Sequence, residues 1–212
     1  MHHQCQHCAV PMIDAGICPE CQKRPPNFRC CIAALRYQNP INAAVIRIKN
    51  DALAPELKQL SWLLTETIVQ RYQELTLPTI LIPMPLHWLK LLRRGFNQSQ
   101  LIATTVQCKL TSTSVRADLC TRLHYGKPQH LQSRRHRQRS MSNAFTCRPI
   151  ADLAGARVAL VDDVVTTGAT ATAAADSLLQ AGVKSVDLWC IARTGWHNGA
   201  SSIKIPRNLN EI

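Results

Sequence analysis

One segment in the last third of the chain limits what this sequence can fold into more than any other. Residues 157–161 form an almost wholly apolar run, which is followed at once by two carboxylates, Asp162 and Asp163. A Thr-Thr-Gly turn comes next, and residues 169–181 after it are rich in alanine. The apolar run predicts a strand buried on both faces, and the alanine-rich run predicts a helix. The segment therefore predicts a strand that ends in paired carboxylates and turns directly into a helix.

A second apolar run, residues 186–191, makes the fold class specific. It follows the glycine that closes the predicted helix. A strand, a helix and a strand at this spacing form a βαβ unit, so we expect a parallel sheet and an α/β fold. Earlier in the chain, the spacing of apolar residues predicts a helix over 55–75 and another that Asn97 caps and that runs to about residue 110. Residues 79–83 between them predict a short buried strand.

The turn between the strand and the alanine-rich helix carries groups that suit a phosphate. A helix N-terminus presents unpaired backbone N–H groups and a partial positive charge. Gly168 lets the backbone approach a ligand closely, and the hydroxyls of Thr166, Thr167 and Thr170 add donors. The paired carboxylates suit a ribose diol or a hydrated Mg²⁺. An ordinary strand-to-helix turn with a threonine cap is the alternative.

The ten cysteines are distributed unevenly, and six of them lie within the first 31 residues. Two pairs of the form Cys-x-x-Cys match a tetrahedral zinc site of the ribbon or knuckle type. Four thiolates leave no open coordination position, and a module this small depends on the metal for its folding energy. We therefore expect a structural Zn²⁺ held by Cys5, Cys8, Cys18 and Cys21.

Other interpretations of the cysteines stay open at this point. The pairs could form a redox dithiol or be incidental, and His2, His3 or His7 could replace a ligand. Cys30 and Cys31 are left out of the site, because an adjacent pair rarely donates both thiols to one ion. The remaining cysteines are scattered singly and are expected to be small buried hydrophobic residues: Cys108, Cys120, Cys147 and Cys190.

The charge of the chain favours polyanionic partners. Lys and Arg total 25 against 13 acidic residues, a net charge of +12, although a basic surface that only keeps the protein soluble is the alternative. The charge is densest at residues 122–139, which we expect to be a mobile basic loop or a solvated hairpin. A short basic connector with Arg36, Arg47 and Lys49 is expected after the cysteine module. No apolar run approaches the ~20 residues of a membrane span, and the first residues lack a secretory signal, so a cytoplasmic location is expected.

Residues 158–170 closely resemble the thirteen-residue signature of the type I phosphoribosyltransferases. That resemblance implies a parallel sheet flanked by helices, which binds 5-phosphoribosyl-1-diphosphate together with Mg²⁺. It also implies that Asp162 and Asp163 hold the ribose hydroxyls. The residues implied to hold the 5-phosphate are Val165, Thr166, Thr167, Gly168, Ala169 and Thr170.

The chain as a whole resembles the competence ComF family, also called ComFC or GntX-like. The resemblance rests on the cysteine module, on the phosphoribosyltransferase signature, and on a second motif formed by residues 82–86 and 93–98. Single positions that also agree are Lys49, Gln129, Arg137, Asn143, Ala144, Phe145, Ile191, Ala192 and Arg193. The expected organisation is a zinc module at 1–31, a phosphoribosyltransferase-like domain at 32–195 and a tail at 196–212.

The ComF resemblance implies a role in natural transformation, in which the protein handles incoming single-stranded DNA. A competence helicase or an inner-membrane DNA channel is implied as a protein partner, which would place the protein at the periphery of the inner membrane. Because aromatic residues make up only 5% of the chain, we expect contacts to the DNA backbone more than base stacking. The residues expected to bind DNA are Arg94, Lys127, Arg134, Arg135, Arg137 and Arg139.

Two other functions are compatible with the same motifs. One is an active phosphoribosyltransferase with an unknown acceptor, for which the sequence offers no evident general base and the basic loop could serve as a lid. The other is an adaptor that docks a partner through its zinc module. Arg93, Arg94 and Asn97 could reach a diphosphate, or they could belong to a basic helix start at which Asn97 is only the N-cap.

Overall fold

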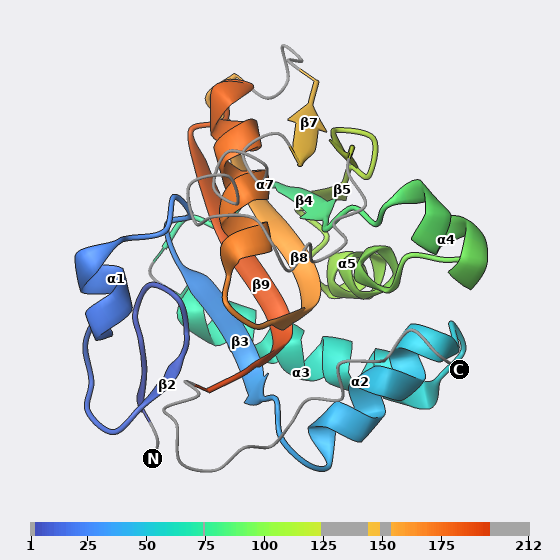
Figure 1. Cartoon of the computed structure of the whole chain (residues 1–212), viewed down its shortest axis with the longest axis horizontal. Coiled ribbons are helices and arrows are strands. Elements are labelled where there is room, and N and C mark those ends of the chain that lie inside the picture. The colour runs from blue at the N-terminus through green and yellow to red at the C-terminus, as the bar shows by residue number, and fades with distance from the viewer. Residues whose placement is uncertain (1–2, 74, 124–143, 149–153, 196–212) are drawn as a thin grey trace, which may run out of the picture.

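The computed structural model describes residues 3–73, 75–123, 144–148 and 154–195 (Figure 1). Five strands form a central parallel sheet in the order β3-β9-β8-β4-β5. These strands are β3 (Cys31–Arg36), β4 (Ile80–Pro83), β5 (Ser114–Val115), β8 (Arg157–Val165) and β9 (Ser185–Arg193). The predicted parallel α/β fold is therefore confirmed.

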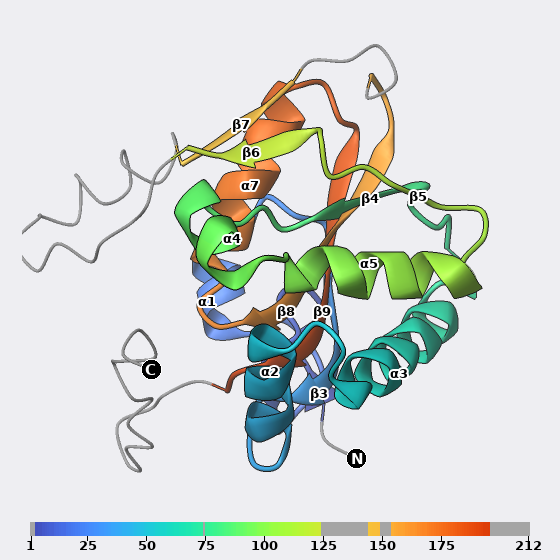
Figure 2. The same cartoon turned by 90° about the vertical axis from the view of Figure 1, so that its right-hand side faces the viewer.

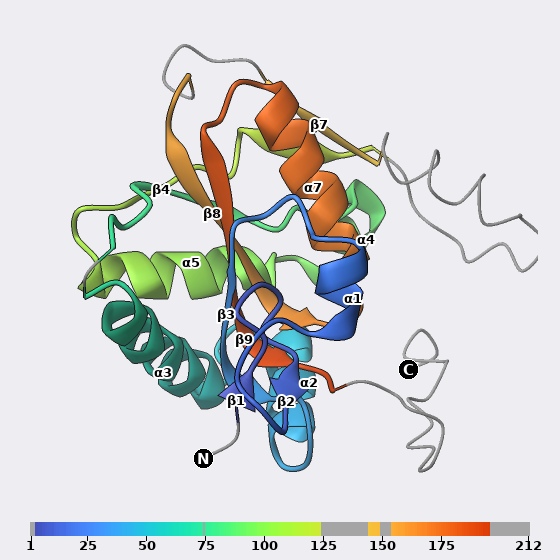
Figure 3. The same ribbon diagram turned by 90° about the vertical axis from the view of Figure 1, so that its left-hand side faces the viewer.

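Helices cover both faces of this sheet (Figures 2 and 3). Three of them pack on one face: α2 (Ile41–Asn50), α3 (Pro55–Arg71) and α5 (Gln98–Lys109). The other face carries α7 (Ala169–Gln180) and the N-terminal segment. Along β8, Ala159 and Val161 belong to the buried cluster of the first face, whereas Val158 and Leu160 belong to that of the second. This two-sided burial explains why the whole strand is apolar.

Local sequence signals set the ends of several elements, as expected. Asn97 is the N-cap of α5, and its side chain accepts a hydrogen bond from the backbone N–H of Ser99 at 3.0 Å. Pro55 occupies the first turn of α3, where a missing N–H costs nothing. Gly182, with a φ of 100°, follows α7. The helices therefore begin and end within a few residues of the positions that these signals predict.

The expected basic connector after the cysteine module is wrong. Residues 31–36 form the edge strand β3, and residues 41–50 form helix α2. The helix buries Ala44, Val45 and Ile48 against the sheet and leaves its basic residues on other faces. The apolar residues Ile41, Ala44, Val45 and Ile48 have the i, i+3, i+4, i+7 spacing of an amphipathic helix, so the sequence did contain the signal that the connector interpretation overlooked.

The N-terminal segment is tied to the sheet by more than its own cysteines. It contains β1 (His3–Gln4), β2 (Pro11–Met12) and α1 (Pro19–Lys23). Beyond α1, Arg29 donates two hydrogen bonds to the buried Asp187 of β9, at 2.8 and 2.5 Å. Tyr72 also donates a hydrogen bond to Asp187, and the indole N–H of Trp189 donates one to Tyr72. A buried carboxylate paired in this way joins the segment to the last strand of the sheet.

A two-stranded antiparallel ribbon lies beside α7. It consists of β6 (Cys120–Arg122) and β7 (Phe145–Cys147). Phe145 is buried, and the Ser177 hydroxyl of α7 donates a hydrogen bond to its carbonyl oxygen at 3.3 Å. Most of the predicted basic loop lies outside the described residues, and so does the predicted tail. Within the described part of the chain, no helix is both long and apolar enough to cross a membrane.

Candidate functional site

The predicted Thr-Thr-Gly turn into a helix is present, but the prediction that the strand ends at the paired carboxylates is wrong, because β8 runs through Asp162 and Asp163 and stays paired with β9 as far as Val165. Strand β8 ends at Val165, and helix α7 begins at Ala169. Gly168 is the N-cap of α7 with a φ of 79°, a left-handed conformation that favours glycine. The first N–H of the helix, that of Ala169, donates a hydrogen bond to Thr167 Oγ1 at 3.3 Å, and the N-cap glycine adds no further side-chain acceptor. The other N–H groups of the first turn are thus available to an anion.

This turn forms one wall of a cavity of about 160 Å³. Asp162 lines the cavity from the end of β8, and Arg122 lines it from the ribbon. The opposite wall comes from the segment after β4 and from the start of α5. The residues of the turn and of these walls are Thr166, Thr167, Gly168, Thr170, Met84, Pro85, Leu86, Gln98 and Ser99. The cavity therefore brings a carboxylate, an arginine and a helix N-terminus together at the carboxyl end of the sheet.

The two predicted carboxylates have different surroundings. Asp163 is 4% exposed and forms an ion pair with Lys49, whose Nζ lies 3.1 Å from Oδ2. Asp162 faces the cavity, and the Ser99 hydroxyl donates a hydrogen bond to its Oδ1 at 3.0 Å. Loss of solvent at the strand end, together with the adjacent Asp163 carboxylate, raises the pKa of Asp162 to about 8. Asp162 is thus the carboxylate placed to contact a ligand.

Lys49 has a role that the sequence did not reveal. It agrees with the family pattern, but only the fold shows that α2 carries it to the end of β8. Burial lowers the pKa of the Lys49 ammonium, and the Asp163 and Asp162 carboxylates outweigh this effect, so that the pKa is raised overall. Lys49 therefore stays charged and compensates the carboxylate pair.

Of the two interpretations of Asn97, the N-cap is confirmed. Its amide also donates a hydrogen bond to the Met84 carbonyl oxygen at 3.1 Å, which fixes the segment after β4. Arg93 and Arg94 end the helix α4 (Trp88–Arg94) instead of starting one. Arg94 donates a hydrogen bond to Gln98, which lines the cavity, and Arg93 is exposed.

Arg193, the last residue of β9, joins the turn between β8 and α7 to the cysteine segment. Its side chain is buried, and its Nε donates a hydrogen bond to the Cys8 carbonyl oxygen at 2.9 Å. Its Nη1 donates to the carbonyl oxygens of Val165 at 3.1 Å and of Thr166. One guanidinium therefore holds the backbone of both segments. Sequence spacing could not predict this contact, since Cys8 and Arg193 are 185 residues apart.

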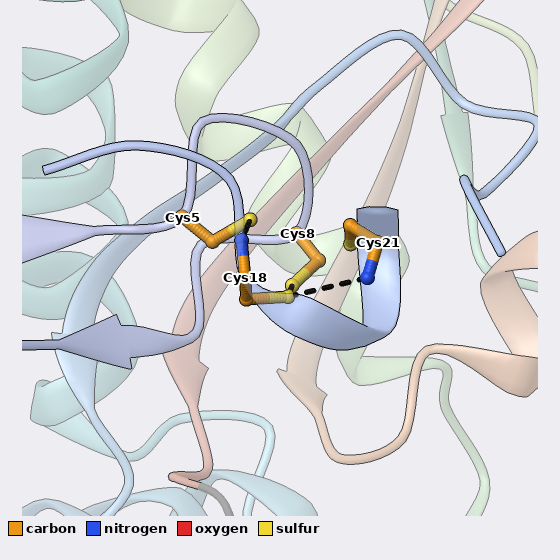
Figure 4. Close-up of side chains that lie close together, drawn as sticks. All are labelled: Cys5, Cys8, Cys18 and Cys21. Atoms are coloured by element: carbon orange, nitrogen blue, oxygen red, sulfur yellow. Dashed lines mark hydrogen bonds between the residues drawn. The ribbon is translucent and has the colours of Figure 1, made fainter. Parts of the chain in front are cut away.

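The four predicted cysteine ligands lie together (Figure 4). All four are buried, and their Sγ atoms lie within 4.8 Å of one another. The Sγ atoms of Cys8 and Cys18 are 3.7 Å apart, which fits the separation of about 3.8 Å that Zn–S bonds of ~2.3 Å give in a tetrahedron. The N–H of Cys18 donates to Cys5 Sγ at 3.3 Å, and that of Cys21 donates to Cys18 Sγ at 3.4 Å. The cluster can therefore hold a metal ion.

Backbone donors favour ionisation of one cysteine of this cluster, whereas burial raises the pKa of Cys8 and Cys21. Burial opposes ionisation of Cys5, but hydrogen bonds from backbone N–H groups outweigh it and lower the pKa of this thiol to about 7. A thiolate is the form that binds a metal.

The other cysteines differ in how deeply they are buried. Cys120 and Cys190 are buried as expected, and Cys147 is half-buried. The expectation for Cys108 is wrong, because it lies on an exposed face of α5. Cys30 and Cys31, which we left out of the metal site, are outside the cluster of four.

Most of the residues expected to bind DNA lie outside the described residues: Lys127, Arg134, Arg135, Arg137 and Arg139. Arg94 is described, and it belongs to a helix with an unusual surface. Helix α4 buries none of its residues, contains no acidic residue, and exposes Trp88 by 62% and Leu92 by 76%. Lys90, Arg93 and Arg94 make it strongly basic.

The comparison with known families agrees with the cavity. The model of the phosphoribosyl transferase domain matches residues 92–205, more than half of the chain. The chain therefore belongs to the phosphoribosyl transferase domain family.

Two kinds of named relatives narrow this class. The chain is 32% identical over 201 residues to the DNA utilization protein YhgH of Escherichia coli (strain CFT073), covering 90% of this chain and 84% of the relative. It is 28% identical over 194 residues to competence protein F of Haemophilus influenzae, covering 89% and 84%. The protein is thus a member of the family that contains YhgH and competence protein F, as its motifs predict. A purine phosphoribosyltransferase from Pyrococcus horikoshii is 17% identical, with a TM-score of 0.43 and coverage of 69% and 78%.

Proposed function

We propose that this protein handles incoming single-stranded DNA during natural transformation or DNA utilisation, and that it carries a site for 5-phosphoribosyl-1-diphosphate. The observation that supports the sugar-diphosphate site is the meeting of Asp162 with the N-terminus of α7 in one cavity. The names of the relatives support the proposed role in DNA handling.

The residues around the cavity fit the parts of a magnesium-bound sugar diphosphate. The 5-phosphate would bind the residues 165–170 at the start of α7, where N–H groups and threonine hydroxyls donate. Asp162 would bind the ribose hydroxyls or water molecules on Mg²⁺, whereas Asp163 would act through its ion pair with Lys49. Arg122 lines the same cavity and would neutralise the diphosphate. Mg²⁺ would supply charge neutralisation to the bound diphosphate.

The cysteine cluster would hold Zn²⁺ as a structural ion. Four cysteines complete a tetrahedral shell, so no position is left for a reacting group. Their burial against the face that carries α7 means that the metal would stabilise the segment next to the phosphate-binding turn. Its contribution would therefore be to folding and not to chemistry.

Helix α4 is the described surface that best fits a nucleic-acid strand. Lys90, Arg93 and Arg94 offer charge to phosphates, and the exposed ring of Trp88 offers a surface for a base. The helix follows the segment of Met84, Pro85 and Leu86 that lines the cavity, so that DNA and the sugar diphosphate would bind close together.

The test is fluorescence anisotropy of a labelled single-stranded oligonucleotide at several salt concentrations, with and without 5-phosphoribosyl-1-diphosphate and Mg²⁺. We expect affinity to fall steeply with salt and to change when the sugar diphosphate is added. If no binding occurs at low salt with the zinc-loaded protein, DNA handling is ruled out.

An active phosphoribosyltransferase is the second candidate, and a specific observation favours it. A larger cavity, of about 420 Å³, adjoins the phosphate-binding turn and is lined by residues of α1, α7 and the segment around Phe28. This volume would admit an acceptor the size of a nucleobase. Release of diphosphate from 5-phosphoribosyl-1-diphosphate in the presence of an acceptor would decide for the enzyme.

A further inference from the structure

Two cysteines that the proposed function does not use face each other on the ribbon. Cys120 of β6 is the register partner of Cys147 of β7, and their Sγ atoms lie 3.1 Å apart. They are 27 residues apart in sequence. A disulfide bond is about 2.05 Å long, so the two sulfurs need to move by only about 1 Å to reach it.

The hydrogen-bond pattern of the ribbon places this pair at the position that suits a disulfide. Backbone N–H groups on either side of the pair donate across the ribbon, from Leu123 to Ala144 and from Arg148 to Leu119. Hydrogen-bonded and non-hydrogen-bonded pairs alternate along an antiparallel ladder, so Cys120 and Cys147 form a non-hydrogen-bonded pair. The Cα atoms of such pairs are about 4.5 Å apart, which lies within the disulfide range of roughly 4.4–6.8 Å.

The two thiols also differ in exposure, and thiol–disulfide exchange begins at a thiol that the oxidant can reach. Cys147 is half-buried and reachable, whereas Cys120 is 2% exposed and packed in the core. An oxidant in solution can reach Cys147 and not Cys120. Cys147 is therefore the attacking thiol and Cys120 the resolving one.

We propose that Cys120 and Cys147 form a reversible disulfide by exchange with a low-molecular-weight disulfide such as oxidised glutathione. The Cys147 thiolate attacks one sulfur of glutathione disulfide and releases the first glutathione thiolate. Cys120 then loses its proton, attacks the Cys147 sulfur of the mixed disulfide and releases the second. Two electrons pass from the protein to the oxidant, so that two molecules of reduced glutathione form for each protein disulfide.

The disulfide would fix the position of a residue in the candidate site. Arg122 and Phe145 form the next non-hydrogen-bonded pair and lie on the same face of the ribbon as the two cysteines. The guanidinium carbon of Arg122 lies 5.6 Å from the centre of the Phe145 ring, and its buried Nε makes no hydrogen bond to the described residues. Since Arg122 lines the cavity, closing the disulfide holds this charge at the cavity and strengthens anion binding. This second step rests on the proposed sugar-diphosphate site.

The experiment equilibrates the full chain, loaded with Zn²⁺, in glutathione buffers of graded ratio. Free thiols are then trapped by alkylation, and peptides are analysed by mass spectrometry. Exposed Cys108 is the internal control, because it has no partner sulfur among the described residues and forms only a mixed disulfide. Cys120→Ser and Cys147→Ser are the matched variants, each of which retains one thiol of the pair.

We expect the intramolecular disulfide to exceed the mixed disulfide at this pair about tenfold, in a buffer that half-modifies Cys108, because the second thiol acts at a high effective concentration. Cys120→Ser should trap glutathione on Cys147, and Cys147→Ser should leave Cys120 largely unmodified. A pair that stays reduced, or that carries only mixed disulfides, while Cys108 reacts would overturn the proposal.

A second measurement separates this proposal from the proposed function. Calorimetric titration with magnesium diphosphate is carried out on the oxidised and the reduced protein, and we expect the oxidised form to bind about threefold to tenfold more tightly. Equal affinity in both states would overturn the link to Arg122 but not the disulfide. No diphosphate binding in either state, with the disulfide formed, would count against the sugar-diphosphate site alone.

Discussion

The side chain of Arg193 donates a hydrogen bond from Nε to the carbonyl oxygen of Cys8, 2.9 Å away. The same guanidinium donates from Nη1 to the carbonyl oxygens of Val165 and Thr166. The loop that carries a candidate metal ligand and the turn that would bind a phosphate are therefore held by one side chain. A change in either loop is transmitted to the other through this residue.

Replacing Arg193 should weaken both loops. Arg193→Lys keeps the charge but loses the planar set of donors, so the Cys8 carbonyl oxygen is left without a partner, and those of Val165 and Thr166 keep only their hydrogen bonds from Thr194. We expect the free energy of unfolding to fall by about 2 to 3 kcal/mol and the affinity for 5-phosphoribosyl-1-diphosphate to fall about tenfold. Denaturant unfolding and ligand titration measure the two effects. Arg157→Lys, at the opposite end of β8, is the control and should change neither.

The affinity for magnesium and 5-phosphoribosyl-1-diphosphate should depend on pH through Asp162. Its raised pKa, about 8, means that the carboxyl is protonated and uncharged below this pH. We expect affinity to rise about tenfold between about pH 7 and about pH 9, as the carboxylate forms. The unfolded chain releases this proton at a lower pH, so the same group makes the folded chain less stable as the pH rises towards 8. Asp162→Asn should bind weakly at every pH, and a pH profile like that of the native chain would contradict the assignment.

The ion pair between Lys49 and Asp163 allows a double-mutant test. Lys49→Met leaves a nearly buried carboxylate without its cation. We expect a loss of about 2 kcal/mol in the free energy of unfolding, allowing for the partial exposure of the lysine. Lys49→Met with Asp163→Asn should recover most of this loss, because no buried charge is then unpaired. Thermal or denaturant unfolding of the four proteins gives the coupling energy, and strictly additive losses would show that the two side chains act separately.

Removal of the metal should unfold the N-terminal segment first. Cys18→Ser removes one of the four ligands, and we expect less than one Zn²⁺ per chain by elemental analysis, together with rapid proteolysis near residues 1–31. Cys108→Ser is the matched control, since this cysteine is exposed and remote from the cluster. Full zinc content in Cys18→Ser would contradict the four-ligand assignment.

Trp88 should contribute to DNA binding if α4 is the surface that contacts the strand. Trp88→Ala removes one stacking surface, which is worth about 1–3 kcal/mol per base, so we expect roughly a tenfold loss in affinity for single-stranded DNA. Trp62→Ala is the control, because Trp62 is 39% exposed on α3 and its ring is covered by Lys58 and Lys109. Equal losses in both variants would argue for non-specific contacts.

Local signals predict the elements that form the phosphate-binding turn. The two-sided burial of β8, the positive φ of Gly168 and the cap at Asn97 each leave a mark in neighbouring residues of the sequence. The cysteine ligands are predictable for the same reason, since each pair spans one tight turn. The sequence does not reveal which distant side chains pair with the carboxylates or bind the backbone of these turns. Lys49 and Arg193 act through contacts that exist only after the sheet has formed.

Helix α2 shows a second limit of prediction from the sequence. Its apolar residues are at helical spacing, but the run is only ten residues long and its basic residues resemble those of a solvated segment. Its place in the fold comes from packing against the sheet, which supplies most of the stability of a short helix. The pattern in the sequence alone therefore understates how ordered this segment is.

The strand order has a consequence for how the chain folds during synthesis. Strand β3 is the first strand of the central sheet to be made, yet its register partners, Cys31 with Leu188 through Arg36 with Arg193, are on the last. A nascent chain that ends before residue 185 therefore has all four cysteines of the candidate metal site but lacks the strand that pairs with β3. The cysteine segment can capture its ion early, but it must wait for the final strand before it can dock. Truncation from the C-terminal side should therefore prevent the whole chain from folding, including the N-terminal segment that is synthesised first.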